Sequence, residues 1–418
     1  MTCSRRFTGF LSRAATRNCA AFIMALGLLQ GLCVNAYADA NSVCILISFD
    51  GFRHDYISRL PNGAIKELIA HGCTADALIP VNPTKTFPNH WSIATGLYPS
   101  DHGIVDNRFY DRVLNDTFNM TRTEPVWWRG EPIWTTVERA GKTAFTYFWP
   151  GSSTPINGHL PSKWFAYEHS RDYTSRVDSI VTWASMPKPP DLIVSYFELL
   201  DDAGHRYGPN APQVDSALAV ANSVISRLVK GLEARGVINN CTIVLVSDHG
   251  MAEINPATPH DKHLSVEQFM ADPTVRVIVS NPNILVYGLP GTTANTIATG
   301  INADSQTYRA TATPVSDLDT AWHIQYPGRT PDLIITAAYG YDIDIGKRPA
   351  RKSTGGNHGY SNSISDMHGI FIASGHRIKP GRIQPLSVID VYNIICKLTN
   401  VPPARNSGNA NRVSDVVH

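Results

Sequence analysis

Aspartate and histidine side chains follow several buried, strand-like segments of this sequence. Asp50 follows the run at 43–49, Asp201 and His205 follow the run at 191–197, and Asp248 and His249 follow the run at 242–247. In an open α/β sheet, ligands bind just beyond the carboxyl ends of the strands, and parallel strands end at the same edge. The sequence therefore predicts that these side chains converge at one edge of a sheet.

His358 adds a third histidine to this group, in the segment GGNHGYSN shortly before the apolar run at 369–374. Mixed carboxylate and imidazole ligands suit Zn²⁺, with Mn²⁺ and iron as chemical competitors. Three aspartates and three histidines are too many for one tetrahedral ion but sufficient for two, each with room for a nucleophile or a substrate oxygen. Two ions roughly 3.5–4 Å apart can stabilise both the attacking and the leaving oxygen of a phosphoryl displacement.

A candidate nucleophile lies in the segment NPTKTFPNH, residues 82–90. A threonine hydroxyl becomes a usable nucleophile when metal coordination lowers its pKa. Pro88 suits the first turn of a helix, so a threonine just before it would lie near free N–H groups that favour a phosphate. Thr86 fits this position best, whereas Thr84 can equally be a strand or turn residue.

Each of these residues has a simpler interpretation, because a single aspartate at a strand end is more often a turn or cap residue than a metal ligand. The hypothesis rests on the joint pattern. Other motifs are interpreted as lying away from the site. We expect Asp101-His102-Gly103 in a loop, His260 and His263 at the surface, and His368 at the wrong end of its strand. His54 and Asp55 lie close to Asp50, and only Asp50 of this cluster is expected to face the site.

The elements that position these residues are predicted from hydrophobic patterns. Unbroken apolar runs at 43–49, 191–197, 242–247, 332–337 and 369–374 are typical of strands covered on both faces of a parallel sheet. Amphipathic helices are predicted between them, at 62–71, 89–97, 133–140, 172–185, 213–233 and 388–399. This alternation predicts an α/β domain with a mostly parallel central sheet and helices on both faces. The segment at about 256–356, rich in Pro, Thr, Asn and Asp, is interpreted as a small inserted α+β subdomain.

The first 38 residues are predicted to be a signal peptide. Four arginines precede an apolar stretch, and Ala36 and Ala38 offer a cleavage site after Ala38. The apolar stretch is shorter than the ~20 residues that a spanning helix needs. We therefore expect a periplasmic or secreted mature chain, 39–418, with no membrane span.

Charge and cysteine content narrow the function classes further. A formal net charge of +1 over 418 residues argues against a binder of nucleic-acid duplexes, but not against a nucleotide held in a pocket. The mature chain would keep Cys44, Cys73, Cys241 and Cys396. These four allow three complete disulfide pairings, or they are small buried hydrophobic residues.

Five segments resemble the nucleotide pyrophosphatase/phosphodiesterase family of the alkaline phosphatase superfamily: SFDGFRHDY, TKTFPNHWSIATGLYPSDHGIVDN, DDAGHRYGP, SDHGM and NHGY. The resemblance spans about residues 43–398 and implies an alkaline-phosphatase-like fold and the single catalytic domain of a bacterial member. One departure is Ser361-Asn362, where many members have Asp-Asn. This departure implies that a carboxylate which helps to orient the metal ligands is missing.

The resemblance also implies a role for each site residue. Thr86 would be the nucleophile that forms a phosphorylated intermediate. One Zn²⁺ would be surrounded by Asp50, Thr86, Asp248 and His249, and a second Zn²⁺ would be held by Asp201, His205 and His358. Asn107 would donate a hydrogen bond to a phosphate oxygen, and Phe87 and Tyr167 would form opposite walls of a slot for a nucleobase or another leaving-group moiety.

Together these features predict a two-zinc phosphodiesterase or nucleotide pyrophosphatase that acts on a small-molecule diester or nucleotide. A phosphonate hydrolase or phosphate monoesterase on the same metal scaffold is an alternative. A transferase that passes the phosphoryl group to an alcohol is another, and a metal-holding binding protein without catalysis is a third. The sequence leaves the physiological diester and the oligomeric state open.

Overall fold

The structure, a computed structural model, describes residues 42–254, 272–343 and 355–418. The predicted signal peptide at 1–38 and the pair His260 and His263 lie outside the described residues. Within the described segments, no helix is long and apolar enough to cross a membrane.

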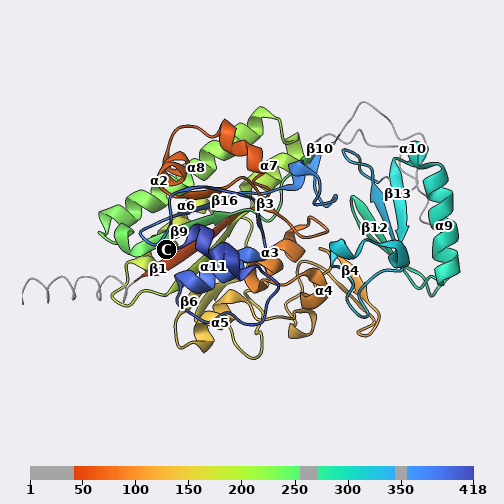
Figure 1. The fold of residues 1–418 in the computed structure, drawn as a ribbon, viewed down its shortest axis with the longest axis horizontal. Helices are drawn as coiled ribbons and strands as arrows, with labels where there is room; N and C mark the ends of the chain where they lie inside the picture. Colours follow the sequence, from red (N-terminus) through yellow and green to blue (C-terminus); the bar gives the residue numbers. More distant parts are fainter. Residues whose placement is uncertain (1–41, 255–271, 344–354) are drawn as a thin grey trace, which may run out of the picture. The chain divides into compact units, whose positions relative to one another are not determined.

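An eight-stranded sheet forms the centre of the fold (Figure 1). Its strand order is β17 (Gly381–Ile383), β2 (Cys73–Ala75), β16 (Phe371–Ser374), β9 (Cys241–Val246), β1 (Val43–Phe49), β8 (Leu192–Phe197), β6 (Ala144–Tyr147) and β7 (Lys163–Phe165). The central strand β1 pairs in parallel with β8 on one side and β9 on the other. The predicted mostly parallel α/β sheet is thereby confirmed.

One predicted parallel strand has the opposite direction. The run at 369–374 forms β16, which is antiparallel to both of its neighbours, β2 and β9. A fully buried antiparallel strand has the same unbroken apolar pattern as a parallel one, so the pattern does not fix the direction.

Side chains of β1 alternate between two hydrophobic cores, which explains why its sequence lacks polar alternation. Ile45 and Ile47 belong to the core beneath α2 (Ala64–His71), α6 (Tyr173–Ala184) and α8 (Pro212–Ala234). Cys44 and Leu46 belong to the core beneath α3 (Thr86–Thr95), α5 (Ile133–Arg139) and α11 (Asp390–Leu398). Figure 1 shows these two groups of helices on opposite faces of the sheet, as predicted.

The helix predicted at 89–97 begins earlier than expected, at Thr86. Lys85 before it has extended backbone, and Gly96 ends the helix in a left-handed conformation with φ +66. Pro88 lies in the first turn, where a backbone N–H has no partner within the helix, so its missing N–H costs little. Thr86 therefore lies within the first turn itself.

A second sheet is built from later residues, in the order β11 (Arg276–Ser280), β12 (Asn283–Tyr287), β14 (Leu333–Ala337) and β13 (Ala310–Pro314). All of its pairings are antiparallel, so the run at 332–337 is not a strand of a parallel sheet as predicted. The helix α9 (Gly291–Ala303) covers one face, and residues of the other face join the core beneath α3. The limits of the inserted subdomain stay a prediction.

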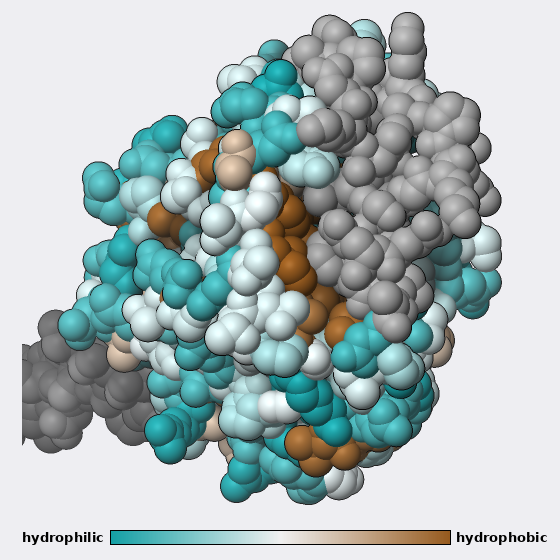
Figure 2. Space-filling view, turned by 90° about the vertical axis from the view of Figure 1, so that its right-hand side faces the viewer, coloured by the Kyte–Doolittle hydropathy of each residue, from teal (hydrophilic) through white to brown (hydrophobic). Residues whose placement is uncertain are grey.

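Among the coloured residues of Figure 2, hydrophilic side chains predominate and apolar surface forms a band and a few small patches. Apolar side chains gather instead in the buried cores on the two faces of the central sheet. Stability should therefore depend on core side chains far more than on apolar side chains at the surface.

The four cysteines of the predicted mature chain are buried and unpaired. Burial raises the pKa of the Cys44 and Cys241 thiols to about 12 and that of Cys73 to about 11. Such thiols are almost wholly protonated at neutral pH and unreactive. The structure thus agrees with small buried hydrophobic residues rather than with disulfides.

Helix α8 offers a matched test of this fold. Leu228 is fully buried, whereas Val220 on the same helix is 42 % exposed. Leu228→Ala should lower the free energy of unfolding by about 2–5 kcal/mol, and Val220→Ala should change it by less than about 0.5 kcal/mol. Urea unfolding monitored by circular dichroism measures both, and equal losses would contradict the packing described.

Candidate active site

Three strands of the central sheet deliver aspartates to one edge, as the sequence predicts. Asp50 directly follows β1, and Asp248 follows β9. Asp201 does not end β8 itself: it lies on α7 (Leu199–Tyr207), which begins two residues after that strand. Because side chains four residues apart share one face of a helix, α7 directs Asp201 and His205 to the same point.

The first group of candidate ligands surrounds His249. Its Nε2 atom lies 3.3 Å from Asp50 Oδ1 and 3.1 Å from Asp248 Oδ2. The hydroxyl of Thr86 lies 3.3 Å from the same nitrogen. Two strand ends and the first turn of α3 therefore meet around one point.

The second group surrounds Asp201. Its Oδ1 atom lies 3.4 Å from His205 Nε2 and 3.6 Å from His358 Nε2. His358 follows the short strand β15 (Gly356–Asn357), which pairs with β10 (Ala252–Glu253). The structure thus brings together all six aspartates and histidines of the predicted ligand set.

Hydrogen bonds to backbone carbonyls fix the tautomer of each of the three histidines. Nδ1 lies 2.8–2.9 Å from a carbonyl oxygen in every case: Gly356 for His205, Gly250 for His249 and Thr84 for His358. A carbonyl can only accept, so Nδ1 carries the proton and Nε2 presents a lone pair to the site. Nε2 of His205 and Nε2 of His358 are 3.1 Å apart, and two facing lone pairs repel unless a cation lies between them.

The carboxylates point to the same requirement. Asp50 Oδ1, Asp201 Oδ1 and Asp248 Oδ2 are buried and have no hydrogen-bond partner among the described residues. Burial raises the pKa of all three carboxyls, and mutual repulsion raises those of Asp50 and Asp248 further. Buried charges of one sign need a counter-charge, so the donor set fits divalent cations.

His90 is a residue of this site that the sequence did not indicate. It lies 3.3 Å from Asp248 Oδ2, close enough to suggest a further ligand. Both of its ring nitrogens are already used, however: Nδ1 donates to the carbonyl of Thr86, and Nε2 accepts from the Ser48 hydroxyl. His90 therefore connects the backbone of the candidate nucleophile to a candidate ligand, and does not have a free lone pair for a metal.

Two further positioning residues were also missed. The Tyr196 hydroxyl donates to Asp50 Oδ2 over 2.6 Å, which leaves Oδ1 for a cation. The Thr84 hydroxyl donates to Tyr360 O and accepts from Gly359 N, each over 2.9 Å, while its carbonyl orients His358. Nothing in local sequence reveals such contacts, because each partner lies more than 140 residues away.

The other Asp and His motifs with described residues contribute none of the candidate ligands, although Asp101 and His102 lie in a short helix and not in a loop as predicted. His102 ends the short helix α4 (Pro99–His102) and is buried beside Ser92. Asp55 pairs with Arg53, and His368 contacts the carbonyl of Asn362. Ser361 contacts the Ser363 hydroxyl over 2.9 Å.

A pocket of about 430 Å³ opens over Thr86 and the candidate ligands. Its walls are largely aromatic. Phe87, on one side, packs against Phe118 and Trp128 with ring centres 6.0 and 6.1 Å away. Tyr167, half-exposed, packs against Phe148 and Tyr196 with ring centres 5.4 and 5.9 Å away.

Asn107 also lines this pocket. Its side-chain Oδ1 accepts a hydrogen bond of 2.8 Å from the backbone N–H of Phe87. The amide is thereby oriented, and its Nδ2 group remains able to donate. Asn107 and Thr86 thus line the same pocket, and Asn107 is hydrogen-bonded to the residue that follows Thr86.

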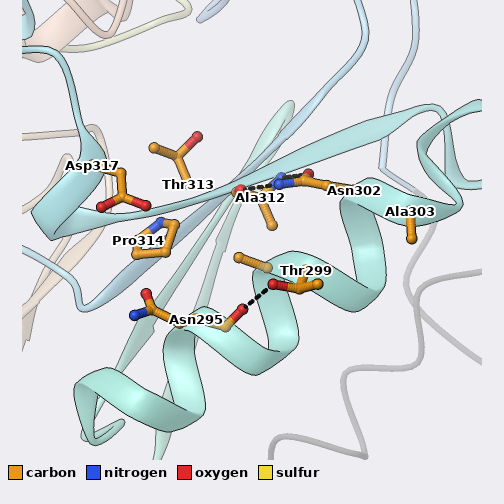
Figure 3. Close-up of a pocket in the computed structure, with 9 residues that line it drawn as sticks. Asn295, Thr299, Asn302, Ala303, Ala312, Thr313, Pro314 and Asp317 are labelled. Carbon is orange, nitrogen blue, oxygen red and sulfur yellow. Dashed lines mark hydrogen bonds between the residues drawn. The ribbon is translucent and has the colours of Figure 1, made fainter.

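A second, larger hollow of about 720 Å³ lies against α9 and β13. Figure 3 shows that its most prominent amide, Asn302, points at the backbone of β13, where it bonds to both the N–H and the carbonyl of Ala312. Thr299 donates to the carbonyl of Asn295. Its polar groups serve the fold, which leaves the aromatic pocket as the candidate active site.

The fold and the site define a class of proteins. Murine ectonucleotide pyrophosphatase/phosphodiesterase 5 superimposes with a TM-score of 0.81, at 27% identity, over 90% of this chain and 100% of that chain. An inactive threonine-to-alanine form of that murine protein has been solved in complex with AMP. The α/β fold is that of the alkaline phosphatase superfamily.

Sequence comparison then gives the family. The family model "Type I phosphodiesterase / nucleotide pyrophosphatase" matches residues 44–361, and this chain belongs to that family. It is 36% identical over 390 residues to bovine ectonucleotide pyrophosphatase/phosphodiesterase family member 3, covering 87% of this chain and 43% of the relative. It is 34% identical to a venom phosphodiesterase of Macrovipera lebetinus, covering 88% and 44%. The chain thus spans less than half the length of these relatives.

Asp248→Asn tests the need for a counter-charge. The new amide would donate to His249 Nε2 in place of a buried anion, so the metal-free protein should become more stable by on the order of 1–3 kcal/mol at pH 7. Because the folded-state pKa of Asp248 is raised, its charge destabilises the metal-free fold at neutral pH, and the difference should shrink as pH falls through that pKa.

Urea unfolding in EDTA and metal analysis of the dialysed protein measure these effects, and the bound metal should decrease. Asp178→Asn, which alters an exposed pair with Arg227, serves as the control and should keep its metal. A destabilised Asp248→Asn protein that retains full metal content would refute the interpretation.

Proposed function

We propose that this protein is a two-zinc phosphodiesterase or nucleotide pyrophosphatase in which Thr86 is the nucleophile. The observation that carries the proposal is the position of the Thr86 hydroxyl, 3.3 Å from a histidine Nε2 lone pair at the floor of an aromatic pocket. The threonine-to-alanine change in the inactive, AMP-bound murine protein agrees with a threonine of this role.

The six ligands divide into two sets. Asp50, Asp248 and His249, with the Thr86 oxygen, would hold one Zn²⁺, and Asp201, His205 and His358 would hold the other. Tetrahedral Zn²⁺ accepts such carboxylate and imidazole donors and keeps a position for substrate. Bound zinc would lower the pKa of the threonine hydroxyl and stabilise charge on the phosphoryl oxygens.

The protein's own groups would orient the diester for in-line attack. Asn107 Nδ2 would donate to a non-bridging oxygen, beside the N-terminal end of α3, where the helix dipole favours an anion. Thr86 Oγ would form a bond to phosphorus as the bond to the leaving oxygen breaks, and the leaving oxygen takes up a proton. Water would then form a bond to phosphorus as the bond between phosphorus and Thr86 Oγ breaks, one proton of the water would pass to Thr86 Oγ, and a phosphomonoester would be released.

The aromatic walls support a nucleotide or another planar leaving group. Phe87 and Tyr167 line the same pocket from different elements, and a base between two aromatic rings gains stacking energy of about 1–3 kcal/mol. The AMP complex of the murine relative agrees with this assignment.

A diester fits the charges of the pocket better than a monoester does. A monoester carries an additional negative oxygen that needs a cation. The arginine that lines the pocket, Arg122, is already paired with Asp116 and Glu124. Lys85 beside Thr86 is buried and donates to a backbone carbonyl. We therefore favour the diesterase over the phosphate monoesterase.

Export is part of the proposal. The relatives include a venom phosphodiesterase and ectonucleotide pyrophosphatases, and the predicted signal peptide at 1–38 would place the mature chain in the periplasm or outside the cell. Sequencing the amino terminus of the exported protein tests the predicted cleavage after Ala38.

Thr86→Ala should abolish turnover of bis-p-nitrophenyl phosphate, with a fall in kcat of at least about 10⁴-fold. The variant loses the nucleophile and the 3.3 Å hydrogen bond between its hydroxyl and His249 Nε2. A bound metal would take that nitrogen lone pair, so the melting temperature of the metal-loaded variant should stay near that of the parent. Thr86→Ser keeps the hydroxyl and is the matched control, which should retain measurable activity. Near-normal diesterase activity in Thr86→Ala would disprove this mechanism.

A substrate panel separates the related chemistries. We expect kcat/KM for a nucleotide p-nitrophenyl ester to exceed that for p-nitrophenyl phosphate by about 100-fold or more, since each 1.4 kcal/mol of added transition-state binding gives a factor of ten. Tyr167→Ala should lower kcat/KM for the nucleotide ester more than for bis-p-nitrophenyl phosphate. Preference for the monoester, or for a phosphonate ester, would favour the alternative hydrolases.

A further inference from the structure

The turn between β11 and β12, residues 280–283, contacts three segments that each carry a candidate active-site residue. We propose that this turn of the second sheet is a positioning element, which fixes the nucleophile Thr86, the amide Asn107 and the ligand His358 relative to one another. The inference rests on the proposed function of those three residues, and it assigns a positioning role to residues that do not touch the substrate.

The first contact of the turn reaches the residue before the nucleophile. Lys85 is 5 % exposed, and its ammonium group donates to the carbonyl of Asn281. The carbonyl of Lys85 in turn accepts from the Asn89 side chain over 2.9 Å within α3. The start of α3, and with it Thr86, is thereby fixed to the second sheet.

The second contact reaches Asp106, the residue before Asn107, whose side-chain amide would donate to a phosphate oxygen in the proposed function. The Ser280 hydroxyl donates to Asp106 Oδ1, and Asp106 is 1 % exposed. The same oxygen accepts the backbone N–H of Asn107 over 2.7 Å. Asn107 then accepts from Phe87 N over 2.8 Å, so a continuous chain of hydrogen bonds runs from the turn to the nucleophile's neighbour.

The third contact reaches the segment of His358. Asn283, 1 % exposed, donates from Nδ2 to the carbonyl of Gly359 over 3.0 Å. Gly359 has φ +109, and a Cβ atom there would overlap the side chain of Lys85. The positive φ favours glycine at this position, and the missing Cβ lets the His358 segment and Lys85 pack directly against each other.

These three contacts share a physical purpose. In-line displacement needs the nucleophile within about 3–3.5 Å of phosphorus, and an error of about 1 Å can cost about 10²-fold in rate. Thr86, Asn107 and His358 come from distant parts of the sequence, so their separation is fixed only by contacts between those parts. The opposite charges of Lys85 and Asp106, both buried, make this support expensive to rearrange.

A double-mutant cycle tests the second contact. Ser280→Ala removes one hydroxyl of a residue outside the pocket lining and should lower kcat on bis-p-nitrophenyl phosphate about tenfold, with KM and metal content unchanged. In an Asn107→Ala background, the same change should have less than about a twofold effect, because Ser280 acts through Asn107. Ser280→Thr keeps a hydroxyl and should restore most of the activity.

Ser316→Ala is the matched control. Its hydroxyl bonds to an aspartate in the same way, to Asp317 over 3.0 Å, but at the exposed end of β13, and kcat should not change. Three results would overturn the proposal: an unchanged kcat in Ser280→Ala, equal losses in both backgrounds, or a loss that follows only a lowered melting temperature. A failure of the proposed function itself would be seen differently. In that case Thr86→Ala would keep measurable diesterase activity, regardless of the result of the double-mutant cycle.

Discussion

The site depends on one electrostatic constraint, which is that six lone-pair donors point at each other in a largely buried space. Asp50, Asp201 and Asp248 each present a carboxylate oxygen without a partner, and three histidines add unprotonated Nε2 atoms. Such an arrangement repels itself unless cations occupy it. The fold must therefore hold the ligands in place with interactions that do not involve their donor atoms, and this requirement explains much of the surrounding structure.

Backbone groups provide most of that support. The Nδ1 atoms of the histidines donate to three carbonyls on different segments, and Gly51 N donates to the second oxygen of Asp248. Carbonyl and amide groups of a folded backbone keep their direction with little entropic cost, and such contacts to ligands commonly set metal affinity. The parallel strands β1, β8 and β9 contribute in a coarser way, since they end at one edge and bring the segments within reach.

The sequence is informative wherever function is carried by residues at strand ends. Asp50, Asp201 and Asp248 could be placed at one edge because unbroken apolar runs precede them, although Asp201 lies on α7 and not at the end of β8 itself. The direction of β16 could not be predicted, because burial on both faces gives the same apolar pattern in either direction. The antiparallel pairing of the strand at 332–337 in the second sheet could not be predicted for the same reason.

Residues that act through long-range hydrogen bonds are not indicated by any such apolar pattern in the sequence. Thr84 and His90 lie within a motif that resembles the family, and Tyr196 lies in a strand-like run, but no pattern indicates their contacts. Their partners Tyr360, Ser48 and Asp50 are distant in the sequence. Ser280 and Asn283 belong to a segment that composition marks only as different from the main domain. Their importance becomes visible once the fold brings β11 and β12 against α3. A sequence can thus indicate which atoms bind and react, while the contacts that hold those atoms emerge from tertiary structure.

Two threonines two residues apart illustrate the difference between a side chain's type and its placement. The Thr84 hydroxyl donates its proton to Tyr360 O and accepts from Gly359 N, so it has neither a free proton nor an accessible lone pair. The Thr86 hydroxyl has the same intrinsic chemistry, but its neighbour is His249 Nε2, a lone pair that a metal would claim. A cation bound to that nitrogen would take the lone pair that the Thr86 hydroxyl contacts. Lys85 between the two threonines directs its side chain to the second sheet. In the proposed mechanism, the reactivity of Thr86 would therefore be a property of the three-dimensional site, in which a cation held by neighbouring side chains lowers the pKa of an ordinary hydroxyl.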